Sequence, residues 1–191
     1  MKNLIIAGKL FFLMTLITGV IYPASITLYC YFFVKEKSIG SFIEKNGTKI
    51  GSELIAQKFN DPKYFWNRPS SIDYNPLLSG ASNLSLTSLE LKNQVDIRKQ
   101  QLLKVNEFEV NNNEVLIPQD LLFASGSGLD PHISPKAAIF QATRVAKIRN
   151  INISTVYKII NDLTESPQYG IFGDQRINTL KLNFALDNLK K

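Results

Sequence analysis

The longest uniform stretch of the sequence is a run of 25 residues, Leu10 to Val34, that contains no charged side chain. A helix needs about 20 apolar residues to cross a bilayer, so this run can span one with some tilt. Four aromatic residues within positions 29–33 stand at its end, where such rings favour the headgroup region. The run is too long for the apolar core of a cleavable signal peptide, and its bulky end offers no cleavage site. We therefore expect a retained transmembrane helix over residues 10–34.

Three residues of this run indicate helix packing. Pro23 removes a backbone donor near the middle of the run, and we expect it to kink the helix. Thr15 and Gly19 lie four residues apart on one helix face, where small residues let another helix approach closely. We predict that Thr15, Gly19 and Pro23 pack against other membrane helices.

The orientation of the predicted span follows from its flanks. Two lysines and the terminal amine precede it and two lysines follow it, so the positive-inside rule gives only a small bias. Residues 1–9 form a very short tail, whereas residues 35–191 are long enough for a whole domain. We expect a short cytoplasmic N-terminus and an extracytoplasmic domain.

Residues 38–85 predict a hairpin, a short helix and a long ordered loop. Asn46-Gly47 is a hairpin signal, because both residues readily take positive φ. The apolar positions of Glu53–Phe59 predict a short helix. Asn60–Ser85 is rich in Pro, Ser, Asn and Gly but also carries four aromatic residues, so we expect a loop that is ordered by apolar contacts.

Three longer helices begin at residues that can cap a helix. Thr87 with Glu90 forms a capping box, Ser134 precedes a proline suited to the first turn, and Ser154 is the third cap. A last helix is expected over Thr179–Leu189. The apolar residues expected on the inner faces of the four helices are Leu91, Val95 and Leu102; Ala138, Ala142, Val145 and Ile148; Val156, Ile159, Ile160 and Leu163; and Leu182, Ala185, Leu186 and Leu189.

Between these helices the pattern predicts a polar surface loop over Lys104–Glu114, a short strand over Val115–Ile117 and a loop over Glu165–Gly173. The predicted fold class is therefore one N-terminal transmembrane α-helix plus a mixed α/β (α+β) extracytoplasmic domain. Helices dominate this domain, which also holds a small sheet.

Charge and composition argue against several classes of partner and cofactor. Half of the formal net charge of +6 falls in the first 37 residues, and the rest is interspersed with acidic residues. This distribution argues against a nucleic-acid groove, which would need a dense basic surface. The single cysteine, Cys30, and the single histidine, His132, allow neither an intramolecular disulfide nor a zinc site. We expect no metal site.

Residues 124–135 hold the densest group of reactive side chains. Ser127, Asp130 and His132 suggest a nucleophilic triad, but they are too close along the chain for a hydrolase arrangement. The Gly-x-Ser-x-Gly elbow is also absent, because position 125 is serine. A tight turn that presents the next helix explains the same residues. A membrane-anchored exported hydrolase using Ser127 and His132 remains the alternative function.

A second small-residue turn covers residues 78–83, and Arg68 follows a cluster of aromatic residues, where a guanidinium can stack or contact a carboxylate. These features are candidate contacts for a partner and, more weakly, for a nucleotide. The candidate contact residues are Arg68, Ser79, Gly80, Ala81, Ser82, Asn83, Ser125, Ser127, Gly128, Asp130 and His132. No catalytic residue is assigned in the main interpretation.

The order and spacing of these motifs resemble the C subunits of Kdp-type potassium-transporting ATPases over essentially the whole chain. Two positions depart from the family pattern: Ala81 stands where a second glycine is usual, and Gly126 where an alanine-type residue is usual. Both are small, so we expect the turns to survive. The matching positions are Thr18-Gly19, Tyr22-Pro23, Gly51-Ser52-x-Leu54-Ile55-x-Gln57-x-Phe59, Tyr64-Phe65, Arg68-Pro69-Ser70, Tyr74-Asn75-Pro76, Ser79-Gly80-x-Ser82-Asn83-Leu84, Ala124-Ser125-x-Ser127-Gly128-Leu129-Asp130, Ile133-Ser134-Pro135, Ala137-Ala138, Arg144-Val145-Ala146, Arg149, Asn178, Leu182-Asn183 and Ala185-Leu186-Asp187.

The resemblance implies a non-catalytic accessory subunit of a high-affinity potassium importer in the bacterial plasma (inner) membrane. Its expected partners are a potassium-channel-like subunit, a P-type subunit that hydrolyses ATP, a small single-helix subunit and membrane lipid. Members of this family are described as catalytic chaperones that raise the ATP affinity of the P-type subunit. A domain outside the membrane cannot touch cytoplasmic ATP, so we expect any such effect to reach the nucleotide through the membrane subunits.

Overall fold

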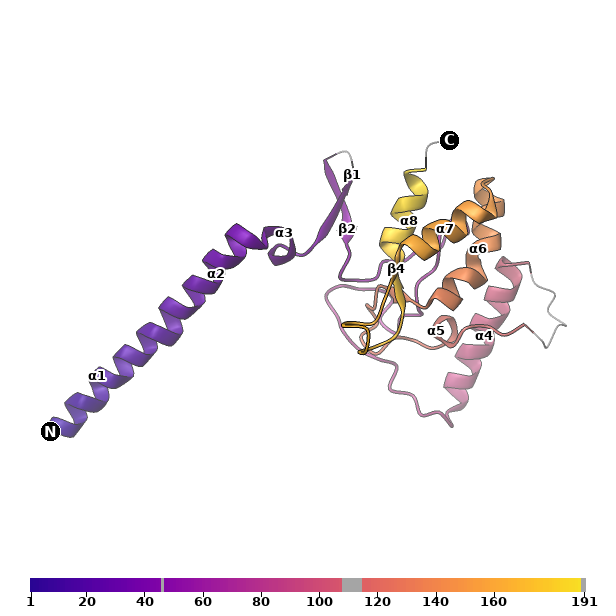
Figure 1. Ribbon diagram of the computed structural model, residues 1–191. Helices are drawn as coiled ribbons and strands as arrows, with labels where there is room; N and C mark the ends of the chain where they lie inside the picture. Colours follow the sequence, from indigo (N-terminus) through magenta and orange to yellow (C-terminus); the bar gives the residue numbers. More distant parts are fainter. Residues whose placement is uncertain (46, 108–114, 190–191) are drawn as a thin grey trace. The chain divides into compact units, whose positions relative to one another are not determined.

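The computed structural model describes residues 1–45, 47–107 and 115–189, and about half of the chain is helical (Figure 1). Contacts within the chain divide it into a first unit, Met1–Ser52, and a second unit, Glu53–Lys191. The limits predicted for the cytoplasmic tail, the span and the domain stay predictions.

The first unit begins with one long apolar helix, Lys2–Phe33, none of whose 18-residue span window is buried. It consists of α1 (Lys2–Leu16), a π-helical turn η1 (Ile17–Ile21) and α2 (Tyr22–Phe33). A helix of 32 residues is long and apolar enough to cross a membrane. A short helix, α3 (Lys35–Ser38), follows.

The π-helical turn lies directly before Pro23. Proline has no N–H and crowds the preceding turn, so the regular i to i−4 ladder cannot continue unchanged there. The N–H of Tyr22 donates to the carbonyl of Ile17, five residues back. The Thr18 and Thr27 hydroxyls donate to the carbonyls of Met14 and Pro23 at 2.7 and 2.8 Å. The backbone before Pro23 thus forms a wider turn, and the kink expected there stays a prediction.

The predicted hairpin is confirmed by its two strands, β1 (Phe42–Lys45) and β2 (Thr48–Ser52), which pair antiparallel. Gly47 takes a φ of +75°, as a hairpin turn requires, whereas Asn46 lies outside the described residues. The register shifts between Ile43 and Glu44. At the base of the hairpin the Ser52 hydroxyl donates to the carbonyl of Gly40 at 2.7 Å.

The second unit holds five helices and a three-stranded antiparallel sheet of order β3-β5-β4 in the residues that the structure describes. Ile177 is the central register position, opposite Ile133 on one side and Thr164 on the other. The helices are α4 (Leu89–Val105), α5 (Gln119–Leu122), α6 (Pro135–Arg149), α7 (Ile153–Asp162) and α8 (Thr179–Asp187), and the strands are β3 (His132–Ile133), β4 (Thr164–Glu165) and β5 (Arg176–Asn178).

Helix α6 lies at the centre of the core. Ala137, Ala138, Ala142 and Val145 are fully buried on it, and the small alanines let α7 and the long loop approach its backbone closely. Phe65, from the predicted long loop, is also fully buried. The loop over 60–85 thus contains no regular helix or strand yet contributes to the core, as predicted.

Two predicted elements are wrong. Residues 53–59 form no helix, because their backbone groups bond to distant segments: Ala56 N–H donates to the carbonyl of Leu129 at 2.8 Å. Asn178 and Asn67 donate to the carbonyls of Glu53 and Gln57. Residues 115–117 form no strand, although Ile117 is buried in the core.

The helix boundaries also differ in detail from the prediction. Helix α4 has Ser88 as its N-cap residue rather than Thr87, and no side-chain hydrogen bond caps it. Helix α7 is capped by Asn152, whose Oδ1 accepts from the N–H of Ser154 at 2.9 Å. Ser134 caps α6 as predicted, by accepting from the N–H of Ala137 at 3.1 Å. Ile148 is half exposed instead of facing the core.

The predicted loops fit the structure where it describes them. Helix α4 ends at Val105, and most of the loop predicted over 104–114 lies outside the described residues. Residues 166–173 form a turn closed by the bridge between Gln168 and Phe172. Thr179 begins the last helix, as predicted, and α8 ends at Asp187.

Candidate functional site

Arg68, Asp130 and His132 come together at the surface of the second unit. The Arg68 guanidinium lies 3.0 Å from Oδ2 of Asp130, and Nδ1 of His132 lies 3.1 Å from Oδ1. The same Oδ1 accepts from the backbone N–H of His132 at 3.1 Å. Burial acts to raise the pKa of the Asp130 carboxyl, but the His132 hydrogen bonds and the Arg68 charge outweigh it, so the pKa is lowered. This cluster connects the long loop to the segment before β3.

The two small-residue turns, marked separately in the sequence, lie against each other. Gly80 N–H donates to the carbonyl of Ser127 at 2.9 Å, and the Ser71 hydroxyl donates to the carbonyl of Gly80 at 2.6 Å. Gly128 has a φ of +71°, and a Cβ there would lie 2.6 Å from Cγ1 of Ile72. The contact therefore requires glycine at position 128.

The other candidate contact residues differ in accessibility. Ser79, Ala81 and Asn83 are exposed, and Ser82 is half-buried. Ser125 is buried, and its backbone N–H donates to the carbonyl of Pro69 at 3.1 Å. Only the 79–83 turn therefore presents most of its side chains to a partner.

The alternative hydrolase gains no support from these contacts. The Ser127 hydroxyl accepts from the N–H of Leu129 at 3.1 Å, and the His132 ring is paired with Asp130. A nucleophilic serine needs a hydrogen bond to its base, and the described residues show none between Ser127 and His132.

Two buried amides, which the sequence analysis did not select, hold the long loop to the helices. Gln141 on α6 accepts from Trp66 N–H at 2.8 Å and donates to the Trp66 carbonyl at 3.2 Å. Asn183 on α8 accepts from Phe65 N–H at 2.8 Å and donates to the Phe65 carbonyl at 3.0 Å. Both amides are at most 2% exposed. A polar residue inside an apolar helix face was the signal that could have marked them.

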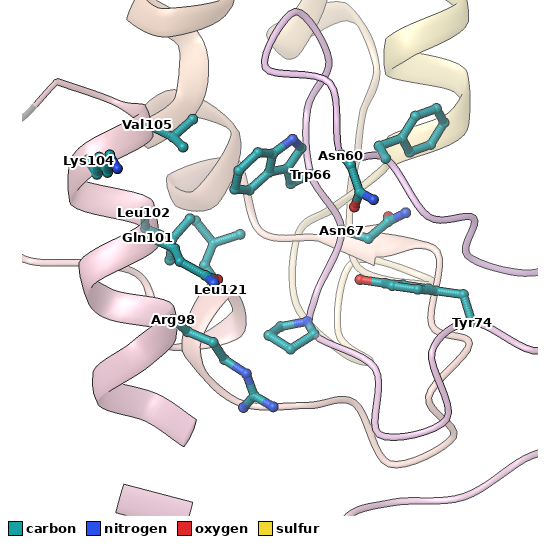
Figure 2. Close-up of a pocket in the computed structure, with 12 residues that line it drawn as sticks. Asn60, Trp66, Asn67, Tyr74, Arg98, Gln101, Leu102, Lys104, Val105 and Leu121 are labelled. Atoms are coloured by element: carbon teal, nitrogen blue, oxygen red, sulfur yellow. The ribbon is translucent and has the colours of Figure 1, made fainter. Parts of the chain in front are cut away.

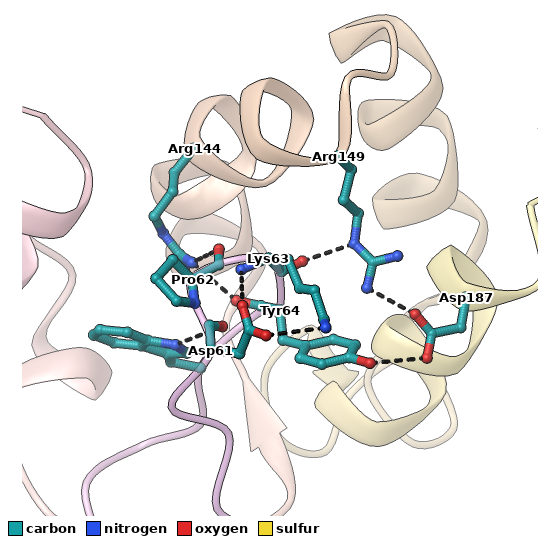
Figure 3. Close-up of polar contacts among 8 residues, drawn as sticks. Asp61, Pro62, Lys63, Tyr64, Arg144, Arg149 and Asp187 are labelled. Atoms are coloured by element: carbon teal, nitrogen blue, oxygen red, sulfur yellow. Dashed lines mark hydrogen bonds and ion pairs between the residues drawn. The ribbon is translucent and has the colours of Figure 1, made fainter.

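Arg144 on α6 holds the same loop from inside the domain (Figure 3). Its guanidinium donates to the carbonyls of Pro62 and Tyr64 and, at 3.1 Å, to Oδ1 of Asn106. The side chain lies over the Trp66 ring, 5.0 Å from the centroid. Burial lowers the pKa of Arg144 to about 10, with a small opposing effect of Asp61. Arg144 is therefore a structural cation at the base of the loop.

Arg149, Tyr64 and Asp187 form a second, more accessible connection between the loop, α6 and α8 (Figure 3). The guanidinium donates to the Lys63 carbonyl at 2.7 Å and to Oδ1 of Asp187 at 2.8 Å. The Tyr64 hydroxyl donates to Oδ2 of Asp187 at 3.1 Å. Burial, and then the Asp187 carboxylate, raise the pKa of Tyr64. These contacts again hold residues 61–66 in place rather than offer free groups to a ligand.

A cavity of about 520 Å³ lies between α4 and the long loop (Figure 2). Burial, and then the Asp73 charge, raise the pKa of Tyr74 to about 12, and its hydroxyl donates to the Arg68 carbonyl at 2.7 Å. Burial lowers the pKa of Arg98, whose guanidinium donates to the Leu122 carbonyl at 2.8 Å. The cavity is lined by Phe59, Asn60, Trp66, Asn67, Pro69, Tyr74, Arg98, Gln101, Leu102, Lys104, Val105 and Leu121.

None of the candidate contact residues lines this cavity. Among the described residues, no group of three or more His, Cys, Asp or Glu side chains is placed to hold a metal ion. In the membrane-type helix, a Cβ at Gly19 would meet only Cγ2 of Thr15, at 3.9 Å, so that face is open to a neighbouring helix. The packing of Thr15, Gly19 and Pro23 stays a prediction.

Comparisons with known proteins agree with the resemblance. The family model "K+-transporting ATPase, c chain" matches residues 4–188. The "Potassium-transporting ATPase KdpC subunit" of Leptospira interrogans is 46% identical over 183 residues, which cover 96% of this chain and 92% of the relative. Those of Methylococcus capsulatus and Geotalea uraniireducens are 45% and 40% identical, covering 92% and 100% of both chains, respectively. The chain therefore belongs to the family of KdpC subunits of potassium-transporting ATPases.

Proposed function

We propose that this chain is a non-catalytic accessory subunit of an ATP-driven potassium importer. Its N-terminal helix crosses the bacterial plasma membrane once, and its second unit works outside the cytoplasm on the assembly and stability of the complex. Potassium is the transported ion, and a partner subunit hydrolyses the ATP. This chain contributes contacts with the other subunits and no catalytic group.

One observation carries this proposal: the apolar helix Lys2–Phe33 has no buried residue in its span window. Exposure of this apolar surface to water costs about 25 cal/mol of free energy for each Å². Lipid and neighbouring membrane helices would cover it. Family membership supplies the neighbours, because the relatives are named as subunits of a potassium-transporting ATPase.

The orientation rests on the flanks of the helix. The whole second unit follows the apolar helix, with more than 150 residues after α2. Lys2, Lys9 and the terminal amine before the apolar run exceed Lys35 and Lys37 after it by one charge, so the positive-inside rule gives a small bias toward a cytoplasmic N-terminus. The second unit then faces the outer ends of the membrane subunits, and we place it on the channel-like subunit.

An effect of this chain on ATP affinity fits the proposal only as coupling between distant sites. An outer domain and a cytoplasmic nucleotide never touch, so the free energy must pass through the membrane subunits. The Kd for ATP then depends on whether this chain is assembled, without a nucleotide site on it.

Deletion of residues 53–191, with the helix and hairpin retained, tests the proposal. We expect growth on very low potassium to be lost, because the importer no longer assembles or holds together. A strain with the full chain and the same tag is the control. Potassium uptake that stays unchanged after the deletion would refute the accessory role.

A further inference from the structure

Residues 74–89, which we call the uncharged segment, contain no Asp, Glu, Lys or Arg. The segment leads from the long loop into α4 (Figure 1). Tyr74, at its start, is partly buried, and most of the other residues are exposed. A water-facing stretch of 16 residues would ordinarily carry several charges, since about a quarter of the residues in soluble domains are charged. Its lack of charge is a feature that it shares with the covered centres of protein interfaces.

Leucines make the uncharged segment strongly apolar. Leu77 and Leu86 are each 90% exposed, and Leu89 is 77% exposed. Leu78 is 54% exposed, so four large apolar side chains face outward within 13 residues. Single exposed leucines are common, but four within 13 residues that carry no charge exceed this background and favour an interaction surface.

The segment is held in one conformation although it has no helix or strand before Leu89. Asn75 makes a turn in which its Oδ1 accepts from Leu77 N–H at 3.0 Å and its carbonyl accepts from Leu78 N–H at 3.1 Å. Gly80 is fixed to Ser127, and Ser85 accepts from Ser88 N–H at 2.9 Å. Because the leucines are presented by a preorganised backbone, less conformational entropy is lost on binding.

We infer that the uncharged segment is the docking surface for an apolar, uncharged surface of another subunit of the complex. This inference rests on the proposed function, which supplies the partner, and it names the residues that make the contact. Because the uncharged segment carries no charge, we expect the partner surface that it contacts to be uncharged as well. A charged partner group buried against Leu77 or Leu78 would lose its hydration without gaining a counter-charge from the uncharged segment.

The size of the segment fits a protein partner. Stable interfaces use about 20–30 residues from each side. The 16 residues of the uncharged segment supply more than half of that number. Leu86 shares one surface hollow with Arg68, Gln119, Asp120 and Phe123. Arg68 and Asp120 then stand at the rim of the interface, where charged groups are usual.

A bilayer is the less suitable occupant. Segments that lie in the membrane interface combine apolar residues with Lys or Arg on their polar face, and the uncharged segment has neither of these cations. Lipid tails also cannot bond to the free backbone groups of an irregular chain, whereas a protein surface can. The observations therefore favour another subunit.

The test is co-purification of the tagged full chain with its partners from native membranes. The double variant Leu77→Asp/Leu86→Asp adds two charges to the uncharged segment without touching the core. We expect recovery of the partner subunits to fall by about tenfold or more, because a central contact is worth at least that in Kd. The neutral variant Leu77→Asn/Leu86→Asn should reduce recovery in the same direction.

The matched control is Leu116→Asp/Ile171→Asp, which places the same charges at residues that are 91% and 78% exposed. Equal losses in the variant and the control, or full recovery with both, would overturn the assignment. Thermal unfolding of each purified chain should show unchanged stability, and the neutral variant keeps the test valid should the charged one unfold.

Two results would identify a different occupant and overturn the inference. One is that the Leu77/Leu86 variants abolish co-purification of two differently tagged copies of this chain while recovery of the partner subunits is unchanged. The other is strong quenching by brominated lipid of a probe on Leu86→Cys, made in a Cys30→Ser chain and measured in the assembled complex. Full recovery of partners by the Leu77/Leu86 variants, with potassium growth still lost on deletion of residues 53–191, would reject this surface and leave the proposed function standing.

Discussion

At the residue scale, the side-chain amides of Asn183 and Gln141 make backbone hydrogen bonds with the long loop. A neighbouring strand would normally supply such bonds to an extended, buried segment. Asn183 donates to and accepts from Phe65, which lies 118 positions away in the sequence. Each buried backbone group that loses its partner costs about 1–3 kcal/mol. The two amides therefore decide whether the loop can enter the core at all.

We predict that Asn183→Leu lowers the free energy of unfolding by about 2–5 kcal/mol, since it removes the partners of both Phe65 backbone groups. Urea unfolding of the full chain in mild detergent measures the effect. The control Asn93→Leu changes an exposed residue of α4 and should stay within about 0.5 kcal/mol of wild type. Equal effects at the two positions would show that the amide pairing carries no stability.

Alanine substitutions at Gly128 and at nearby Gly126 form a matched pair, because a Cβ meets close neighbours at the first position and none at the second. Alanine at 128 would meet Ile72 at 2.6 Å and the Gly80 carbonyl at 3.1 Å, and it would also have to take a φ of +71°. We predict a loss of about 1–3 kcal/mol for Gly128→Ala. Gly126→Ala meets nothing within 4 Å and should be near neutral. If both variants melt at the wild-type temperature, the two turns are not held in contact.

The free energy of unfolding should depend on pH through Asp130, and the sign of this dependence follows from the lowered pKa of its carboxyl. An unfolded Asp titrates near about 3.9, so the folded carboxylate stabilises the domain above that pH and loses its effect as the pH falls through the folded pKa. We predict that wild type is more stable than Asp130→Asn at about pH 5, and that the difference shrinks below about pH 4. Unfolding at several pH values measures it, with exposed Asp96→Asn as the charge control. A difference that grows on acidification would contradict the assignment.

At the element scale, local patterns predicted the hairpin strands, α6 and α8, because turn residues, the α6 cap and the apolar spacing of α8 act on neighbours in the sequence. The Ser134 cap is such a local feature. The short helix expected at 53–59 failed because Ala56 N–H bonds to Leu129, a partner that no local pattern reveals. The contact between the turns at Gly80 and Ser127 escaped prediction for the same reason. At residues 53–59, long-range pairing outweighed weak helix propensity.

The start of α7 shows how two plausible caps can be told apart. Asn152 Oδ1 accepts both from the N–H of Ser154 and from its hydroxyl, at 2.9 and 2.8 Å. We predict that Asn152→Ala costs about 1 kcal/mol and that Ser154→Ala costs clearly less. Thermal unfolding of the two variants compares them directly. The reverse order would restore Ser154 as the cap.

At the scale of the whole molecule, the placement of the second unit outside the cytoplasm is the step on which the mode of action depends. The chain offers a direct test because Cys30 is its single cysteine, so Cys30→Ser gives a cysteine-free background. Under the proposed topology, Lys158→Cys on α7 and Lys2→Cys at the N-terminal end of the apolar helix put one thiol on each side of the membrane. Both positions are exposed.

We predict that a membrane-impermeant thiol reagent labels the cysteine at 158 in cells with an intact plasma membrane, and labels the one at 2 only after lysis. The physical reason is that one apolar helix, which lipid covers, separates two polar flanks that cannot exchange sides. A reporter fused after Lys191 that is active only outside the cytoplasm gives a second readout. Labelling at 2 but not at 158 would place the domain beside the nucleotide, and a direct role in ATP binding would then become the simpler mechanism.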